Sequence, residues 1–88
     1  MNNLRRKRIT EIISKLQALE EQLQAVKEEI EEIKNEEQEC LDNIPENLQS
    51  SERYENVENA VSCLESSIDS IDCIDFEEII DSLEKAME

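Results

Sequence analysis

The stretch ITEIISKLQALEEQLQAVKEEIEEI, residues 9–33, decides the fold. Its apolar side chains recur at alternating spacings of three and four residues, which places them along one side of a helix and is typical of a coiled coil. The pattern predicts one long helix over residues 4–42, with a single acidic residue in its apolar seam. The seam positions are Ile9, Ile12, Leu16, Leu19, Leu23, Val26, Ile30, Ile33, Glu37, Cys40 and Ile44.

The first arm ends at NIPENLQS, residues 43–50. Pro45 has no backbone N–H and disfavours helical geometry at the residue before it, so we expect a turn here. Ser50 or Ser51 can cap a second helix over residues 51–87, because a serine hydroxyl accepts a hydrogen bond from a free N–H at a helix start. The two arms are similar in length. This predicts an all-α fold, a long antiparallel αα-hairpin that packs like a coiled coil.

The apolar pattern of the second arm loses its phase after Ile71, since a strict heptad would bring two acidic residues into the core. The stretch from Asp75 to Glu78 matches a capping box. We expect a continuous or slightly kinked helix, with the kink near residues 72–76. A separate third helix over residues 76–87 is the alternative.

The whole chain, residues 1–88, is short enough to form one domain. It has no glycine, one proline and two aromatic residues, which argues against a β-rich fold. All 24 acidic residues follow a basic N-terminal segment, Arg5, Arg6, Lys7 and Arg8. This acidic surface argues against direct binding of nucleic acid or of an anionic membrane. No apolar run approaches the roughly 20 residues that a membrane span needs.

The side chains that usually carry catalysis are scarce. Cys40, Cys63 and Cys73 show no C-x-x-C spacing and predict reduced thiols in a cytoplasmic protein. There is no histidine and no glycine-rich loop, so neither a Ser/His nor a Cys/His arrangement can form. We expect no enzymatic activity, no cofactor and no metal site.

In a hairpin alone, several apolar residues outside the two seams would remain exposed. A chain of this size with few bulky side chains rarely buries a sufficient core by itself. The residues outside the two seams suggest a second packing face, as in a dimeric four-helix bundle or a larger ring of hairpins. We therefore expect a homo-oligomer, a dimer or larger, with an interface formed by Ile13, Leu41, Ile74 and Ile79.

The run SIDSIDCIDFEE, residues 67–78, repeats Ile-Asp at a spacing of three. On a helix, Asp69, Asp72 and Asp75 would form an acidic stripe with three interpretations. Calcium loops need a flexible segment with a glycine, which argues against a metal site. The stripe could instead imitate nucleic-acid phosphates and bind a DNA-handling protein, or it could be a solvated helix face.

A candidate ligand site lies at the start of the second helix. Free N–H groups beside Ser51, the guanidinium of Arg53 and the ring of Tyr54 suit a phosphate with an attached base. In an oligomer, another chain could add Arg5, Arg6 and Arg8. Alternatively, Arg53 pairs with an acidic residue at the corner, Tyr54 packs in the seam, and the N-terminal arginines balance the acidic end of the other arm.

The segments RRKRITEIISKL and NEEQECLDNIPENLQSSERYE, followed by a helix rich in Leu-Glu and Ile-Asp, resemble small acidic helical proteins of phages and prophage-like elements of Firmicutes. The resemblance covers most of the chain and carries over no catalytic or binding residue. It implies a host-facing accessory role in the cytoplasm of the host cell.

These observations favour a non-enzymatic, oligomeric helical protein that binds and sequesters a host factor. The expected role is phage counter-defence, as an inhibitor of a bacterial immune protein. The alternatives are a sponge for a nucleotide immune signal, a DNA mimic and a plain structural coiled-coil scaffold. The expected partner is accordingly a host protein or a small nucleotide ligand.

Overall fold

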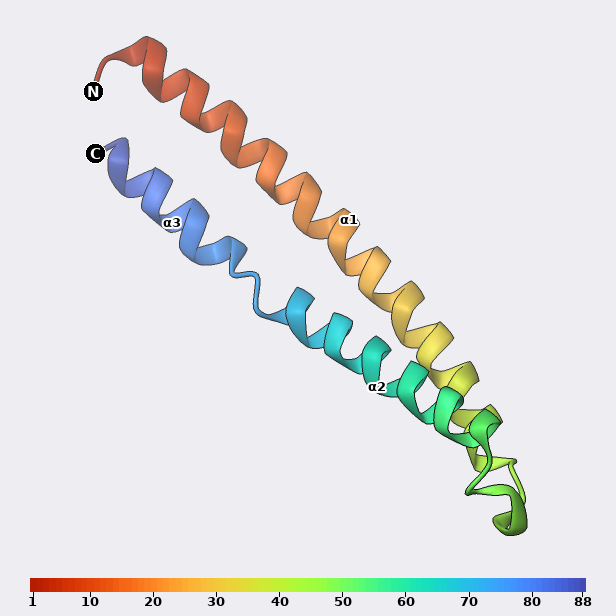
Figure 1. Ribbon diagram of the computed structural model, residues 1–88. Coiled ribbons are helices and arrows are strands. Elements are labelled where there is room, and N and C mark those ends of the chain that lie inside the picture. The colour runs from red at the N-terminus through yellow and green to blue at the C-terminus, as the bar shows by residue number, and fades with distance from the viewer. The chain divides into compact units, whose positions relative to one another are not determined.

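The computed structural model describes all 88 residues, and they form helices without any strand (Figure 1). The all-α prediction is confirmed. The elements in chain order are α1 (Asn3–Asp42), the short 3₁₀ helix η1 (Glu46–Leu48), α2 (Glu52–Asp72) and α3 (Phe76–Ala86).

The helices form two compact units, which we describe separately. The terminal unit contains Met1–Ala25 and Ile74–Glu88, that is, the first part of α1 together with α3. The corner unit contains Val26–Cys73, that is, the remainder of α1, η1 and α2.

The bounds of α1 agree with the predicted helix, and the corner after it forms as expected. Pro45 has extended backbone geometry, with φ −59° and ψ 148°, and its carbonyl accepts a hydrogen bond from the N–H of Leu48 at 2.9 Å. Ser51 then caps α2, because its hydroxyl accepts from the N–H of Tyr54 at 3.3 Å. Of the two predicted caps, Ser51 is therefore the one used.

The continuous second helix that we favoured is wrong. α2 ends at Asp72 and α3 begins at Phe76, so the break lies within the segment where a kink was expected. The carboxylate of Asp75 accepts from the N–H of Glu78 at 3.0 Å and caps α3. The break lets Asp75 cap the new helix by accepting from the N–H of Glu78. A continuous heptad would instead place Asp75 and Glu78 in the apolar seam.

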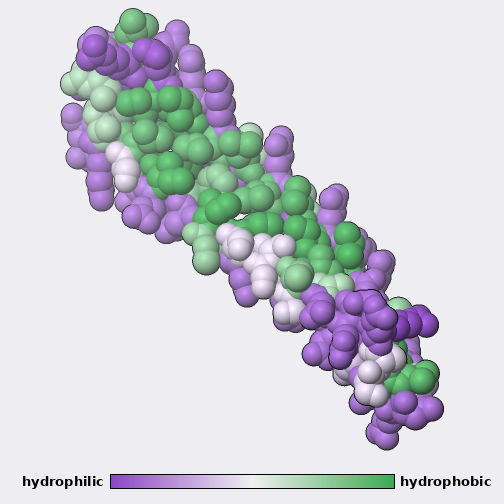
Figure 2. All heavy atoms as spheres, viewed as in Figure 1, coloured by the Kyte–Doolittle hydropathy of each residue, from purple (hydrophilic) through white to green (hydrophobic).

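In the terminal unit, α3 runs antiparallel to the first part of α1. The guanidinium Nε of Arg6, near the start of α1, donates to the carbonyl of Met87, just beyond the end of α3, at 3.0 Å. Ile13 is the buried residue of this unit. Figure 2 shows apolar side chains gathered over the facing parts of α1 and α3, with hydrophilic side chains along the outer edges.

In the corner unit, α1 and α2 also run antiparallel. Lys27 pairs with Asp72 at 2.6 Å, whereas Lys34, two turns further along α1, pairs with Glu65, two turns earlier on α2, at 3.6 Å. Val61 is the buried residue of this unit.

The side of α1 that its own chain covers agrees with one of the two predicted rows of seam residues and differs from the other. Ile9, Leu16, Leu23, Ile30 and their heptad equivalents are half-buried, as expected. The residues covered between them, however, lie one position later than predicted: Ile13, Lys27, Lys34 and Leu41. The predicted Ile12, Leu19, Val26 and Ile33 are 45%, 52%, 45% and 49% exposed.

Ion pairing accounts for this shift in the corner unit. Two acidic side chains of α2 form ion pairs with the ammonium groups of two lysines of α1. The aliphatic parts of these lysines then cover apolar surface that isoleucine and valine would otherwise cover. α1 therefore presents two lysines to its own chain and leaves an apolar row outside.

Candidate binding surfaces

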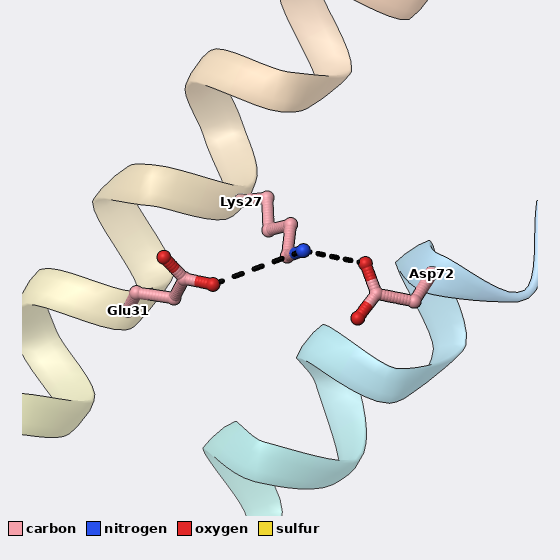
Figure 3. Close-up of polar contacts among 3 residues, drawn as sticks. All are labelled: Lys27, Glu31 and Asp72. Carbon is pink, nitrogen blue, oxygen red and sulfur yellow. Dashed lines mark ion pairs between the residues drawn. The ribbon is translucent and has the colours of Figure 1, made fainter.

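The predicted stripe of Asp69, Asp72 and Asp75 is divided between two compact units. Asp72 is held by Lys27, which also lies 3.8 Å from Glu31, as Figure 3 shows. The hydrogen bond to Asp72 raises the pKa of Lys27, helped by the nearby carboxylates and opposed by partial desolvation. Asp75 belongs to the terminal unit and caps α3. Two of the three carboxylates thus have structural partners, and no group of three or more metal-ligating side chains is placed to hold a metal ion.

The proposed ligand site at the corner is only partly assembled. Arg53 lines a cavity of about 200 Å³ whose other walls include Ile44, Pro45 and Leu48. Ser51 also lines this cavity, but its hydroxyl already accepts from the N–H of Tyr54. Tyr54 is half-buried and is absent from the cavity lining.

The N-terminal arginines differ in their environment. Arg6 is half-buried, and its guanidinium donates to the carbonyl of Met87 and to the side-chain oxygen of Asn3. Arg5 donates its backbone N–H to the side chain of Asn2 at 2.9 Å, which caps α1. Arg8 is exposed and takes part in no ion pair. Arg6 therefore follows the alternative interpretation, balancing the end of the other arm.

The terminal unit carries an acidic groove between α1 and α3, with a volume of about 730 Å³. Its walls carry six carboxylates and only one apolar side chain. Two of these carboxylates have partners, since Asp75 caps α3 and Asp81 pairs with Lys85 at 3.5 Å. The lining residues are Gln17, Glu20, Asp75, Glu77, Glu78, Ile80, Asp81 and Glu84.

Sequence reasoning did not identify this groove. Its signal was present, because acidic residues recur at spacings of three and four residues through α3, opposite Phe76, Ile80 and Leu83. That periodicity becomes visible only when α3 is treated as a separate helix, whereas we had joined it to α2.

The predicted oligomer residues fall into two groups. Ile13 is buried by its own chain and is not on the free surface, whereas Leu41 is half-buried. Ile74 and Ile79 are 46% and 43% exposed. The free apolar surface of α1 is instead the row of Ile12, Leu19, Val26 and Ile33, which sequence reasoning had assigned to the internal seam.

The amount of exposed surface is large for a chain of this mass. The chain exposes 6817 Å², against about 5,400 Å² expected for a compact monomer of 10.3 kDa. Ile13 and Val61 are its only buried apolar residues. No helix combines the length and the apolar character that crossing a membrane would require.

Comparison with protein families, with curated proteins and with solved structures found no match.

Proposed function

We propose that this chain is a non-enzymatic, self-associating helical protein that binds and occupies a host protein, in a phage counter-defence role. In this proposal the two antiparallel helix pairs are parts of one hairpin, and hairpins assemble into a bundle. The observation that carries the proposal is the acidic groove of the terminal unit, lined by six carboxylates and open to a partner.

The chemistry of the groove favours a partner with a basic surface. Lysine and arginine side chains can pair with several carboxylates at once, and like charges lining a groove attract a basic partner over about 8 Å at physiological salt. Ile74 and Ile79 are exposed on the same unit, outside the groove lining. A host protein that handles nucleic acid has such a surface, so occupation of that surface would inhibit it.

The nucleotide-sponge alternative has weaker support. It needs Ser51, Arg53 and Tyr54 to face one ligand, but Tyr54 is absent from the lining of the cavity that Ser51 and Arg53 share. The physical argument for a DNA mimic is unchanged, but different residues would carry it. The carboxylates available for mimicry are the four in the groove that neither cap a helix nor form an ion pair, Glu20, Glu77, Glu78 and Glu84.

The test compares two charge-matched double variants. Glu20→Gln/Glu84→Gln neutralises two groove carboxylates that neither cap a helix nor form an ion pair. Glu32→Gln/Glu58→Gln changes the net charge equally, at exposed positions outside the groove. Each protein is used to capture partners from host lysate over a salt series, and the captured proteins are identified by mass spectrometry.

A specific basic partner should be retained by the wild type and by the control variant, and lost by the groove variant. Equal retention by all three proteins would show that the groove carboxylates do not hold the partner. Equal loss from both variants would show that net charge rather than the groove accounts for capture.

A further inference from the structure

α1 carries four neighbouring rows of residues at a spacing of seven, which lie side by side along the helix. The inner row is Arg6, Ile13, Glu20, Lys27, Lys34 and Leu41. The middle row is Ile9, Leu16, Leu23, Ile30 and Glu37. The outer row is Ile12, Leu19, Val26, Ile33 and Cys40. The rim row is Arg8, Lys15, Gln22, Glu29 and Glu36.

The chain's own helices cover only two of these rows. Inner-row residues are covered except for Glu20, middle-row residues are half-buried, and every outer-row and rim-row residue is exposed. A helix in a bundle normally turns an apolar stripe three rows wide toward its neighbours. The outer row is therefore the uncovered third of such a stripe, and its heptad spacing fits another long helix.

We propose that a second copy of this chain covers the outer row, with its α1 antiparallel to the first. The inference rests on the self-association proposed above and adds the surface, the orientation and the register. The surface of the chain exceeds that of a compact monomer by about 1,400 Å². Each partner in a standard interface buries about 800 Å², so the excess is sufficient for a dimer.

The charges of the rim row fix the orientation. In an antiparallel pair of helices, residues of this row face the same row of the other copy. With a two-fold axis beside Gln22, Lys15 faces Glu29 of the second copy and Arg8 faces Glu36 of the second copy. Gln22 faces its own equivalent, and the two-fold axis repeats both ion pairs. In this register the middle and outer rows interlock, so Leu16 packs near Val26 of the second copy.

A parallel pair lacks these contacts. It would pair the rim row with the inner row of the other copy, where Glu29 could meet Lys34. That lysine faces its own chain, however, and is paired with Glu65. A parallel pair would also place the basic N-terminal segments beside each other. All rim-row charges are free of ion pairs within the chain, so they remain available for the antiparallel arrangement.

Cysteine crosslinking tests the orientation. The three native thiols are exposed and free, so they are first changed to serine. Ile12→Cys and Ile30→Cys are then made separately in this background. Antiparallel packing brings Cys at position 12 beside Cys at position 30 of the other copy. In a parallel pair the same two positions are about 27 Å apart along the axis.

A mixture of the two variants, equilibrated and oxidised, should give a disulfide-linked heterodimer, while each variant alone stays uncrosslinked. Self-crosslinking of Ile12→Cys alone would show parallel packing and overturn the proposal. A dimer by sedimentation without any crosslink would show that the outer row is not the interface, which also overturns it.

Charge reversal provides a second readout that does not depend on new thiols. Lys15→Glu should raise the dissociation constant of the dimer about tenfold, because two ion pairs become repulsive in each dimer. Lys15→Glu/Glu29→Lys should restore wild-type association, since both pairs re-form with the signs exchanged. Failure of the double variant to recover would overturn the register.

These outcomes are separable from the proposed host interaction. A wild-type protein that stays monomeric in sedimentation removes both this inference and self-association, whereas the groove variants still report partner capture. Crosslinks of the wrong orientation remove this inference alone.

Discussion

Ile12 and Ile13 are neighbours in sequence with opposite environments, and alanine substitution should separate them. Ile13 is 9% exposed and Ile12 is 45% exposed. At about 0.8 kcal/mol per buried methylene plus a cavity term, Ile13→Ala should lower the free energy of unfolding by about 2–3 kcal/mol. Ile12→Ala removes about half as much buried surface and improves helix propensity, so it should cost about 1 kcal/mol or less.

The assay is urea unfolding followed by far-UV circular dichroism, at a low protein concentration and at one roughly a hundredfold higher. Ile13→Ala should lose a similar free energy at both concentrations, because its side chain packs within the chain. Ile12→Ala should lose more at the higher concentration, because its side chain then lies in the interface between copies. The burial assigned to α1 would be refuted if the two variants were equally destabilised at low concentration.

Two further predictions concern the ends and pairs of helices. Asp75→Ala should lower stability by about 1 kcal/mol and reduce the helical circular dichroism of α3, because the N–H of Glu78 loses its acceptor, while Asp75→Asn should retain most of both. Lys27 has a raised pKa, so its pairing with Asp72 should contribute stability fully below the ordinary value of 10.5 and lose it as the pH rises above that value. Thermal unfolding from pH 8 to pH 11.5 should therefore show a steeper loss for the wild type than for Lys27→Gln, and parallel curves would contradict this pairing.

The fold could be predicted from the sequence where a residue or a pattern is compatible with only one local structure. The apolar periodicity of residues 9–33 predicted α1, and Pro45 predicted the corner. The break after Asp72 was visible as a loss of phase and as a capping motif, yet both a kink and a new helix satisfied that pattern. The choice depends on whether α3 buries more apolar surface against α1 as a separate helix than as a continuation of α2. The periodicity of the second arm alone does not contain this information.

The candidate surfaces were harder to predict, because they depend on which side of α1 its partner helices cover. Ile12 and Ile13 are equally apolar, so the sequence alone could assign either to the core. The structure separates the two rows through residues distant in sequence. In the corner unit, Asp72 and Glu65 of α2 pair with lysines of the inner row. In the terminal unit, which contains α3, Ile13 is buried and Ile12 is exposed. The residues buried between two helices are therefore determined by both helices, whereas the predicted seam was based on the apolar periodicity of α1 alone.

The row that α1 turns outward is the strongest physical reason to expect a partner. Four of the six inner-row residues are charged, and water would solvate these groups if the row faced solvent. The outer row contains Ile12, Leu19, Val26 and Ile33, which gain nothing from water. A chain selected to function as a monomer would bury the more apolar row and leave the lysines in solvent. This chain does the reverse, and its exposed outer row is the observation behind the proposed dimer. The rim beside that row has a basic first half and an acidic second half, which an antiparallel copy of α1 complements.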